Sequence, residues 1–199
     1  MRAPLGGTGP PPLPSERRLI LTERLALVPA TAELTRAALD GNDALASRLE
    51  AIVPATWPPD LLDPPSLQFT LDRLAEGPEQ AGWWLHFVLL LGTEVRRTLI
   101  GSSGYKGPPS PDGTVEVGYG IVRDHQRRGY ATEVVRGLLA QAFVLPSVRR
   151  VIAETLPELA SSIGVLHKCG FRLIGEGSEP GVIRFELTRA GYAKRKGAA

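Results

Sequence analysis

The spacing of apolar residues along the chain changes repeatedly, and each change marks the border of a predicted element. Segments where apolar and polar residues alternate, or where aliphatic and aromatic residues run together between Gly and Pro, predict strands. These strands cover residues 19–27, 83–91, 98–105, 114–122, 150–155, 171–175 and 182–188. Segments where apolar residues recur every three or four positions predict helices. These helices cover residues 31–39, 43–52, 66–74, 131–145 and 161–169.

Polar and small residues set the expected ends of these helices. Thr31 and either Asn42 or Asp43 are suited to cap the first two helices, because their side-chain oxygens can accept from free backbone N–H groups. The prolines between residues 57 and 65 prevent a helix from continuing there. Gly170 is placed to end the last predicted helix. The helices before and after the Pro-rich stretch are therefore separate elements.

The order of the elements predicts the fold class. The strands at 83–91, 98–105 and 114–122 follow one another without a helix between them, which indicates an antiparallel meander. Beyond residue 129 strands and helices alternate, and that order requires at least one parallel connection. We therefore expect an α/β (α+β) fold built on a mixed, mostly antiparallel sheet of six to seven strands.

The two ends of the chain differ from its middle. Residues 1–17 are dense in Pro and Gly and hold few side chains to bury, so ordering them would cost backbone entropy without return. Lys194, Arg195 and Lys196 form a basic cluster near the other end. We expect a disordered tail over 1–17, one folded domain over 18–190 and a solvated basic tail over 191–199.

Composition argues against several classes of protein. The net charge of +2 is spread in mixed signs along the 199 residues, so we expect no nucleic-acid partner. One cysteine and three histidines, at no metal-ligand spacing, argue against an intramolecular disulfide and a zinc site. No segment approaches the roughly 20 apolar residues that cross a bilayer, and the first residues lack the apolar core of a signal peptide. We expect a cytoplasmic protein with no membrane partner and no bound metal.

The segment from Gln126 to Thr132 is the strongest candidate for a binding site. Arg127, Arg128 and Gly129 precede a predicted helix whose first backbone N–H groups have no partner within the helix. Those N–H groups and the helix dipole attract an anion, and a glycine lets a phosphate approach the backbone closely. The alternative is a tight turn with solvated arginines, since neither a Walker motif nor a Gly-x-Gly-x-x-Gly motif is present.

Three segments, in order along the chain, are similar to motifs of the GNAT superfamily of N-acetyltransferases. Residues 116–121, followed by Gln-x-x-Gly-x-Ala at 126–131, resemble its acetyl-CoA-binding motif, and residues 154–171 resemble its second motif. Residues 21–27 resemble the opening strand of the branch that includes the ribosomal-protein serine/alanine N-terminal acetyltransferases. The resemblance implies a GNAT fold, with helices on both faces of the sheet and a central strand pair splayed by a bulge near Gly118.

The resemblance also implies acetyl-CoA as the cofactor. The backbone N–H groups of residues 127–132 would bind its pyrophosphate, with added charge from Arg127 and Arg128. The backbone of Ile121 and Val122 would pair with the pantetheine arm like an extra strand. The expected cofactor-binding residues are Ile121, Val122, Gln126, Arg127, Arg128, Gly129, Tyr130, Ala131, Thr132 and Ser162.

Transfer of an acetyl group to an amine requires a base that removes the ammonium proton. Glu116 is our first choice, because related enzymes often place a carboxylate on the motif strand. The alternative is that Glu116 is only a surface residue on the polar face of its strand. Glu179 and His125 are weaker candidates for the base.

The departing thiolate needs a hydrogen-bond donor. Many GNAT enzymes carry a tyrosine on the second motif helix, but Leu166 stands at that position, and Leu159 replaces a common asparagine. Ser162 is expected to stabilise the thiolate, although a serine near a helix start could serve only as an N-cap. Cys169 belongs to the apolar face of the same helix and is expected to be a buried structural thiol.

The acceptor is expected to be a small-molecule amine or a protein N-terminus. Aromatic side chains supply apolar walls for such groups, and most aromatic residues of this chain could equally be core. The substrate-binding candidates are Trp57, Trp84, Tyr105 and Tyr119, with Trp57 favoured because it lies in the Pro-rich segment. One rival is a non-catalytic acyl-CoA-binding or regulatory domain, and another is a nucleic-acid-associated protein that uses the basic tail. A homodimer is possible.

Overall fold

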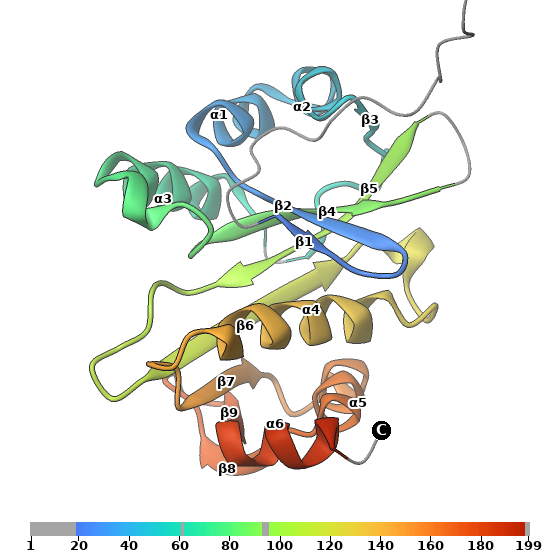
Figure 1. Ribbon diagram of the computed structural model, residues 1–199. Helices are drawn as coiled ribbons and strands as arrows, with labels where there is room; N and C mark the ends of the chain where they lie inside the picture. The colour runs from blue at the N-terminus through green and yellow to red at the C-terminus, as the bar shows by residue number, and fades with distance from the viewer. Residues whose placement is uncertain (1–18, 61, 93–95, 198–199) are drawn as a thin grey trace, which may run out of the picture.

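One mixed sheet of nine strands runs through the part of the chain that the computed structural model describes, residues 19–60, 62–92 and 96–197 (Figure 1). Its strand order is β1-β2-β4-β5-β6-β7-β9-β8, and β3 pairs with β5. The pairs β6–β7 and β3–β5 are parallel, whereas the other neighbours are antiparallel. The bounds are β1 (Ile20–Leu21), β2 (Leu25–Pro29), β3 (Ala51–Ile52), β4 (Leu85–Leu90), β5 (Arg97–Tyr105), β6 (Thr114–Ile121), β7 (Arg150–Thr155), β8 (Arg172–Glu176) and β9 (Ile183–Thr188). The mixed, mostly antiparallel sheet confirms the predicted fold class.

Two strands of only two residues were not expected, and they raise the sheet from six or seven strands to nine. The first predicted strand is split into β1 and β2 because the chain turns there, with the N–H of Thr22 donating to the carbonyl of Leu25 at 2.9 Å. The short strand β3 lies inside the segment 43–52 that was expected to be helical. The helix ends at Leu49 because Glu50 adopts a left-handed conformation with φ of 50°.

The helices lie close to the predicted segments. Their bounds are α1 (Ala32–Asp40), α2 (Asn42–Leu49), α3 (Pro64–Ala75), α4 (Tyr130–Val144), α5 (Ala160–Cys169) and α6 (Arg189–Lys196), with single turns at η1 (Pro78–Gln80) and η2 (Arg123–His125). Thr31 caps α1 as expected, by accepting from the N–H of Leu34. The expected cap from Asn42 or Asp43 is wrong, because α2 starts one residue earlier with Gly41 as its N-cap.

Helices cover both faces of the sheet, as the resemblance implied (Figure 1). Alternation along β2 sends Leu25 and Leu27 into the apolar cluster beneath α4 and α5, and Ala26 and Val28 into the cluster beneath α1 and α2. Because both faces of β2 are covered, all five of its residues are buried. The sheet is therefore the middle layer of three.

The central parallel pair β6–β7 opens along its length. The two strands pair only where Thr114–Glu116 lies beside Arg150–Ile152, although β6 continues to Ile121 and β7 to Thr155. The expected splay is confirmed. The expected bulge near Gly118 is wrong, because β6 stays in uninterrupted register with β5 from Val117 to Ile121. The opening arises instead because β6 stops pairing with β7 after Glu116 but stays paired with β5 as far as Ile121.

The C-terminal segment expected to be a solvated tail forms helix α6. Tyr192 stacks on Phe143 of α4, with ring centroids 4.6 Å apart, and a guanidinium N–H of Arg195 donates to the carbonyl of Lys168 at 3.0 Å. The basic cluster lies on a helix because Tyr192 gives that helix an apolar contact with the domain. The segment 1–17, expected to be disordered, lies outside the described residues. No helix in the described ranges is long and apolar enough to cross a membrane.

Candidate active site

The loop between β6 and α4 presents a row of free backbone donors. Arg127 and Gly129 both adopt left-handed conformations, with φ of 60° and 82°. The first N–H of this helix to find a backbone acceptor is that of Glu133, which donates to the carbonyl of Gly129 at 3.1 Å. The N–H groups of residues 127–132 have no acceptor among the described residues. Six donors at the positive end of a helix dipole make an anion site.

Two side chains tie this loop to the sheet. Gln126 donates from its side-chain amide to the carbonyl of Ile121 at 2.8 Å, which fixes the loop against the end of β6. The guanidinium of Arg24 donates to the carbonyl of Arg128 at 3.2 Å and lies over the ring of Tyr130, 4.6 Å from its centroid. The loop is therefore held in shape without a ligand.

Glu133, in the first turn of α4, anchors the turn between β1 and β2. It accepts from the hydroxyl of Thr22 at 2.6 Å, from the N–H of Arg24 at 2.7 Å and from the guanidinium of Arg24 at 2.7 Å. Burial alone would raise the pKa of Glu133, but these hydrogen bonds outweigh it and hold that pKa below its ordinary value. Sequence reasoning missed both residues of this pair, although Arg24 lies in the opening-strand motif and acidic residues favour a first helical turn.

The open edge of β6 has its own backbone donors. The N–H of Val122 donates to the carbonyl of Ile100 at 2.9 Å, and the carbonyl of Val122 accepts from the N–H of His125 at 3.0 Å. The N–H of Val122 is therefore used by β5 and is not available to the expected pantetheine arm, whereas its carbonyl keeps a second lone pair. Since backbone groups point to opposite sides at alternate residues, the N–H groups of Tyr119 and Ile121 point to the open edge.

Tyr119 and Ser162 meet across the opening between the strands. Tyr119 comes from the half of β6 that pairs with β5 but no longer with β7. Its hydroxyl donates to the carbonyl of Ser162 at 3.2 Å and lies 3.2 Å from the hydroxyl of Ser162. Ser162 stands in the first turn of α5 but is not its N-cap, which is Leu159. The alternative that Ser162 serves only as an N-cap is therefore wrong. Leu159 makes no side-chain cap, so its replacement of asparagine removes a polar group from the helix start.

Glu116 lies on the opposite face of β6 from Tyr119. Its side chain is 20% exposed and forms an ion pair with Lys106, whose N–H also donates to the carbonyl of Glu116 at 2.9 Å. Gly118 and Gly120 share this face by alternation, and a Cβ on Gly120 would lie 3.2 Å from Pro59. The Pro-rich segment therefore packs on β6 at Gly120, four residues along the strand from Glu116.

The two weaker candidates for a base are placed differently. Glu179 is exposed in the turn before β9, where its carbonyl accepts from the N–H of Val182 at 3.2 Å. His125 lies beside the anion-binding loop, where burial and then the charge of Arg128 lower its pKa. Glu116 is the only one of the three whose side chain lies on the strand that borders the opening.

The aromatic candidates separate into core and surface. Trp57 is 7% exposed and packs on Phe87, and Tyr105 is 5% exposed and donates its hydroxyl to the carbonyl of Leu138 at 2.8 Å. The expectation that these two line a pocket for the acceptor is wrong, because both are core residues. Trp84 is half-buried and meets Phe69 edge to face at 5.5 Å. Phe69, which sequence reasoning missed, is 53% exposed.

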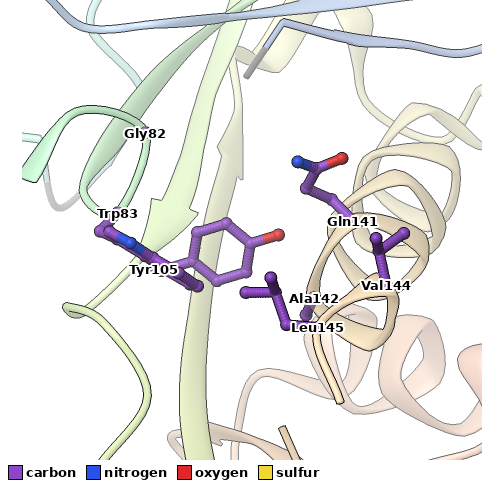
Figure 2. A pocket seen from close by; sticks show the side chains of 7 residues that line it. All are labelled: Gly82, Trp83, Tyr105, Gln141, Ala142, Val144 and Leu145. Carbon is purple, nitrogen blue, oxygen red and sulfur yellow. The ribbon is translucent and has the colours of Figure 1, made fainter. Parts of the chain in front are cut away.

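A small pocket lies at the far end of α4 from the anion-binding loop. Figure 2 shows Tyr105 and Trp83 facing the last turn of that helix. Its volume of about 60 Å³ is far below the roughly 300–1,000 Å³ of ligand pockets. The lining residues are Gly82, Trp83, Tyr105, Gln141, Ala142, Val144 and Leu145. This pocket is therefore not the candidate site.

The residues near the loop fit the phosphates of coenzyme A. Six free N–H groups, the guanidinium groups of Arg127 and Arg128, and the missing side chain of Gly129 supply donors, charge and room. A Cβ built on Gly129 would have only the guanidinium of Arg24 within 4 Å among the described atoms, at 3.5 Å. Space beside the backbone is therefore open to a bound anion.

Comparison with known proteins identifies the family of the chain. The model of the acetyltransferase (GNAT) domain matches residues 24–172. Two curated relatives are uncharacterized N-acetyltransferases, YjdG of Bacillus subtilis, 30% identical over 81 residues, and p20 of Bacillus licheniformis, 31% identical over 77 residues. These alignments cover 41% and 39% of this chain, and 48% and 43% of the two relatives. The chain thus spans about half the length of the curated relatives it matches.

Solved structures share the fold at low sequence identity. A putative ribosomal-protein-serine acetyltransferase from Vibrio cholerae is 21% identical with a TM-score of 0.60, over 86% of this chain and 98% of that one. RimL, a ribosomal alpha-N-protein acetyltransferase in complex with coenzyme A, is 14% identical with a TM-score of 0.59, over the same shares. The family match spans three quarters of the chain and includes the loop, the opening and Glu133. The chain belongs to the GNAT acetyltransferase family.

Proposed function

We propose that this protein transfers the acetyl group of acetyl-CoA to a primary amine by direct attack. The observation that carries the proposal is the set of six free N–H groups of residues 127–132, where α4 begins. The preceding strand is β6, whose outer half lacks its parallel neighbour β7. The first feature suits a pyrophosphate, and the second leaves a slot for a thioester arm. Family membership agrees with both.

The residues of the loop hold the cofactor in this proposal. N–H groups of Arg127 to Thr132 donate to the pyrophosphate, and Arg127 and Arg128 add charge. Gln126 keeps the loop against β6, and Gly129 leaves room for the phosphate. The N–H groups of Tyr119 and Ile121, which point to the open edge of β6, pair with the pantetheine arm.

Proton removal and departure of the thiolate take place on opposite faces of β6. Glu116 accepts the proton of the acceptor ammonium, directly or through water, once Lys106 gives way to the incoming cation. The neutral amine nitrogen attacks the carbonyl carbon and a C–N bond forms. The C–S bond breaks with its electron pair going to sulfur, and the nitrogen releases its second proton to water to give the amide. Ser162 stabilises the charge on sulfur from the first turn of α5.

The proposed acceptor is a small amine or a protein N-terminus that reaches Glu116 past an aromatic pair. Phe69 and Trp84 form an edge-to-face pair, and the ring of Trp84 lies 3.2 Å from a Cβ built on Gly107, next to Lys106. Lys106 is the ion-pair partner of Glu116, and an exposed aromatic surface near it suits an amine that carries an apolar group. The proposed compartment is the cytoplasm, where a single free cysteine such as Cys169 stays reduced. The possible homodimer stays a prediction.

A coenzyme A titration tests the cofactor site. Gly129→Glu places a carboxylate among the donors and is expected to abolish binding measured by calorimetry. Gly181→Glu is the matched control, because Gly181 has φ of 83° and no described atom lies within 4 Å of its Cβ position. Equal binding by wild type and Gly129→Glu, or no binding by either, would show that the site is wrong.

An amine panel separates the enzyme from a non-catalytic coenzyme A-binding domain. The rival has a structural basis, since Leu166 is fully buried and no hydroxyl can reach the opening from its position. Detection of free thiol with peptides, amino acids, polyamines and aminoglycosides as acceptors is expected to show turnover with at least one class. Tight coenzyme A binding, with no thiol released from acetyl-CoA in the presence of any of these amines, would favour the non-catalytic domain.

A further inference from the structure

The family tyrosine missing from α5 leaves the proposed thiolate with Ser162 as its side-chain donor. A second hydroxyl, that of Tyr119, nevertheless lies next to the hydroxyl of Ser162. Tyr119 comes from β6, on the other side of the opening, and its hydroxyl is 3.2 Å from both the carbonyl and the hydroxyl of Ser162. The two groups come from different elements, and Tyr119 belongs to the part of β6 that lies beyond its pairing with β7.

We propose that Tyr119 is a catalytic residue whose hydroxyl, positioned by Ser162, donates a hydrogen bond to the coenzyme A sulfur as the C–S bond breaks. This inference rests on the proposed function. It places the hydroxyl that donates to the thiolate on β6, whereas many GNAT enzymes carry it on the helix that corresponds to α5. It replaces the earlier expectation that Tyr119 binds the acceptor, because the side chain points to the face opposite Glu116.

The surroundings of α5 suit a developing negative charge. The N–H groups of Ser161 and Ser162 have no acceptor within the described ranges, whereas that of Ile163 already donates to the carbonyl of Leu159. The hydroxyl of Tyr119 can turn from the carbonyl of Ser162 to a sulfur atom, and the hydroxyl of Ser162 can donate to either. Tyr119 therefore adds a donor to a site that already favours an anion.

Tyr119 acts as a hydrogen-bond donor and keeps its proton. Burial raises the pKa of Tyr119 to about 12, although its hydrogen bond with Ser162 acts in the other direction. A free thiol has a pKa of about 8.5, so the thiolate is too weak a base to remove the phenol proton. The electron pair of the broken C–S bond stays on sulfur, and the thiolate later takes its proton from water.

Cys169 is the titratable group that acts on Tyr119. Burial raises the pKa of Cys169 to about 11, so both side chains stay neutral between pH 6 and 9, because pH 9 lies about two units below the pKa of Cys169 and about three below that of Tyr119. A titration of bound coenzyme A in that range therefore reports on the cofactor thiol. No acceptor amine has to be identified.

The test measures the pKa of the coenzyme A thiol in its complex with the protein. Thiolate absorbance is followed against pH, with the complex of desulfo-coenzyme A as the reference that removes the protein's own signal. The bound thiol of the wild type is expected to have a lower pKa than free coenzyme A. Tyr119→Phe is expected to raise the bound value by about one to two units, which is the size of a hydrogen bond to a charged group.

Tyr105→Phe is the matched control. It also removes one phenol hydroxyl that donates to a backbone carbonyl, but that carbonyl belongs to Leu138 in the core. Tyr105→Phe is expected to leave the pKa of the bound coenzyme A thiol unchanged. A wild-type thiol with the pKa of free coenzyme A would overturn the inference even if Tyr119→Phe does not fold, and so would an equal value in wild type and Tyr119→Phe.

The same experiment distinguishes failure of this inference from failure of the proposed function. If wild type binds neither coenzyme A nor desulfo-coenzyme A, the proposed function is wrong and the inference falls with it. If both ligands bind and the thiol pKa does not depend on Tyr119, the cofactor site stands and only the role of Tyr119 is wrong.

Discussion

Arg24 and Glu133 lie 109 positions apart in the chain, yet their side chains meet at 2.7 Å beside the anion-binding loop. Glu133 belongs to the first turn of α4 and Arg24 to the turn between β1 and β2. Arg24 also holds the carbonyl of Arg128 and covers the ring of Tyr130. The N-terminal motif of the chain therefore shapes the loop that is proposed to bind coenzyme A, although it lies outside both other motifs.

Glu133→Gln is expected to weaken both the fold and cofactor binding. The substitution leaves the hydroxyl and N–H donors of Thr22 and Arg24 with a poorer acceptor, which costs about 1–3 kcal/mol. Loss of the guanidinium contact also frees the loop, so coenzyme A affinity should fall several-fold. Thermal unfolding and calorimetry at pH 7 measure the two effects.

The stability effect of Glu133 has a definite pH dependence. The pKa of Glu133 in the folded protein is below its ordinary value of 4.5, so its contribution is present above about pH 4.5 and is lost as the pH falls. The difference in melting temperature between wild type and Glu133→Gln should therefore shrink below pH 4.5. Glu154→Gln is the control, because Glu154 has equivalent bonds to Ser178 and Arg184 away from the loop. It should lose stability and keep coenzyme A affinity.

Gly118→Val is expected to remove transferase activity without unfolding the protein. A Cβ on Gly118 meets no described atom within 4 Å, so the free chain has room for the side chain, whereas the proposed thioester slot runs along this strand. Gly101→Val is the contrast, since its Cβ would lie 2.3 Å from the carbonyl oxygen of Gly120. Circular dichroism should show a folded Gly118→Val and a strongly destabilised Gly101→Val. A fully active Gly118→Val would place the slot elsewhere.

Cys169 is expected to be unreactive in the folded protein. It is 4% exposed, its thiol lies 3.7 Å from the carbonyl of Thr132, and burial raises its pKa to about 11. An aromatic disulfide reagent at pH 8 should therefore react with one thiol per chain only after denaturation. Cys169→Ala should lower stability by about 1–2 kcal/mol and keep turnover. Rapid labelling of the native protein would contradict this assignment.

Phe69→Ala is expected to change use of the acceptor and not of the cofactor. Phe69 is 53% exposed, so its removal should alter stability by roughly 0.5 kcal/mol at most. Loss of the aromatic contact beside Trp84 should raise KM for the acceptor several-fold, while KM for acetyl-CoA stays constant. Leu39→Ala is a suitable control, because Leu39 is 37% exposed on α1. Equal changes in the KM for the acceptor in Phe69→Ala and Leu39→Ala would show that Phe69 does not belong to the acceptor surface.

The amino-acid sequence alone predicted most of the helices and strands and pointed to the loop that is proposed to bind the cofactor. Alternation and helical spacing are local properties, so β7 was predicted at its observed bounds and α4 and α5 within about one residue. The loop at Gln126 to Thr132 was predicted as an anion site for the same reason, since free helix donors, arginines and a glycine are contiguous in sequence. The relative positions of residues that are neighbours in sequence follow from the local backbone conformation, so a sequence pattern is enough to predict them.

The tertiary structure decided which distant groups meet. Glu133 with Arg24, and Tyr119 with Ser162, come from segments 109 and 43 positions apart, and no local pattern sets such distances. The same holds for Tyr105, whose hydroxyl is used by the core, and for Val122, whose backbone is used by β5. Periodicity shows that a side chain can be buried or exposed, but burial and hydrogen-bond partners depend on elements that pack from elsewhere in the chain. The opening between β6 and β7 depends likewise on where strand pairing stops, which is a property of the whole sheet.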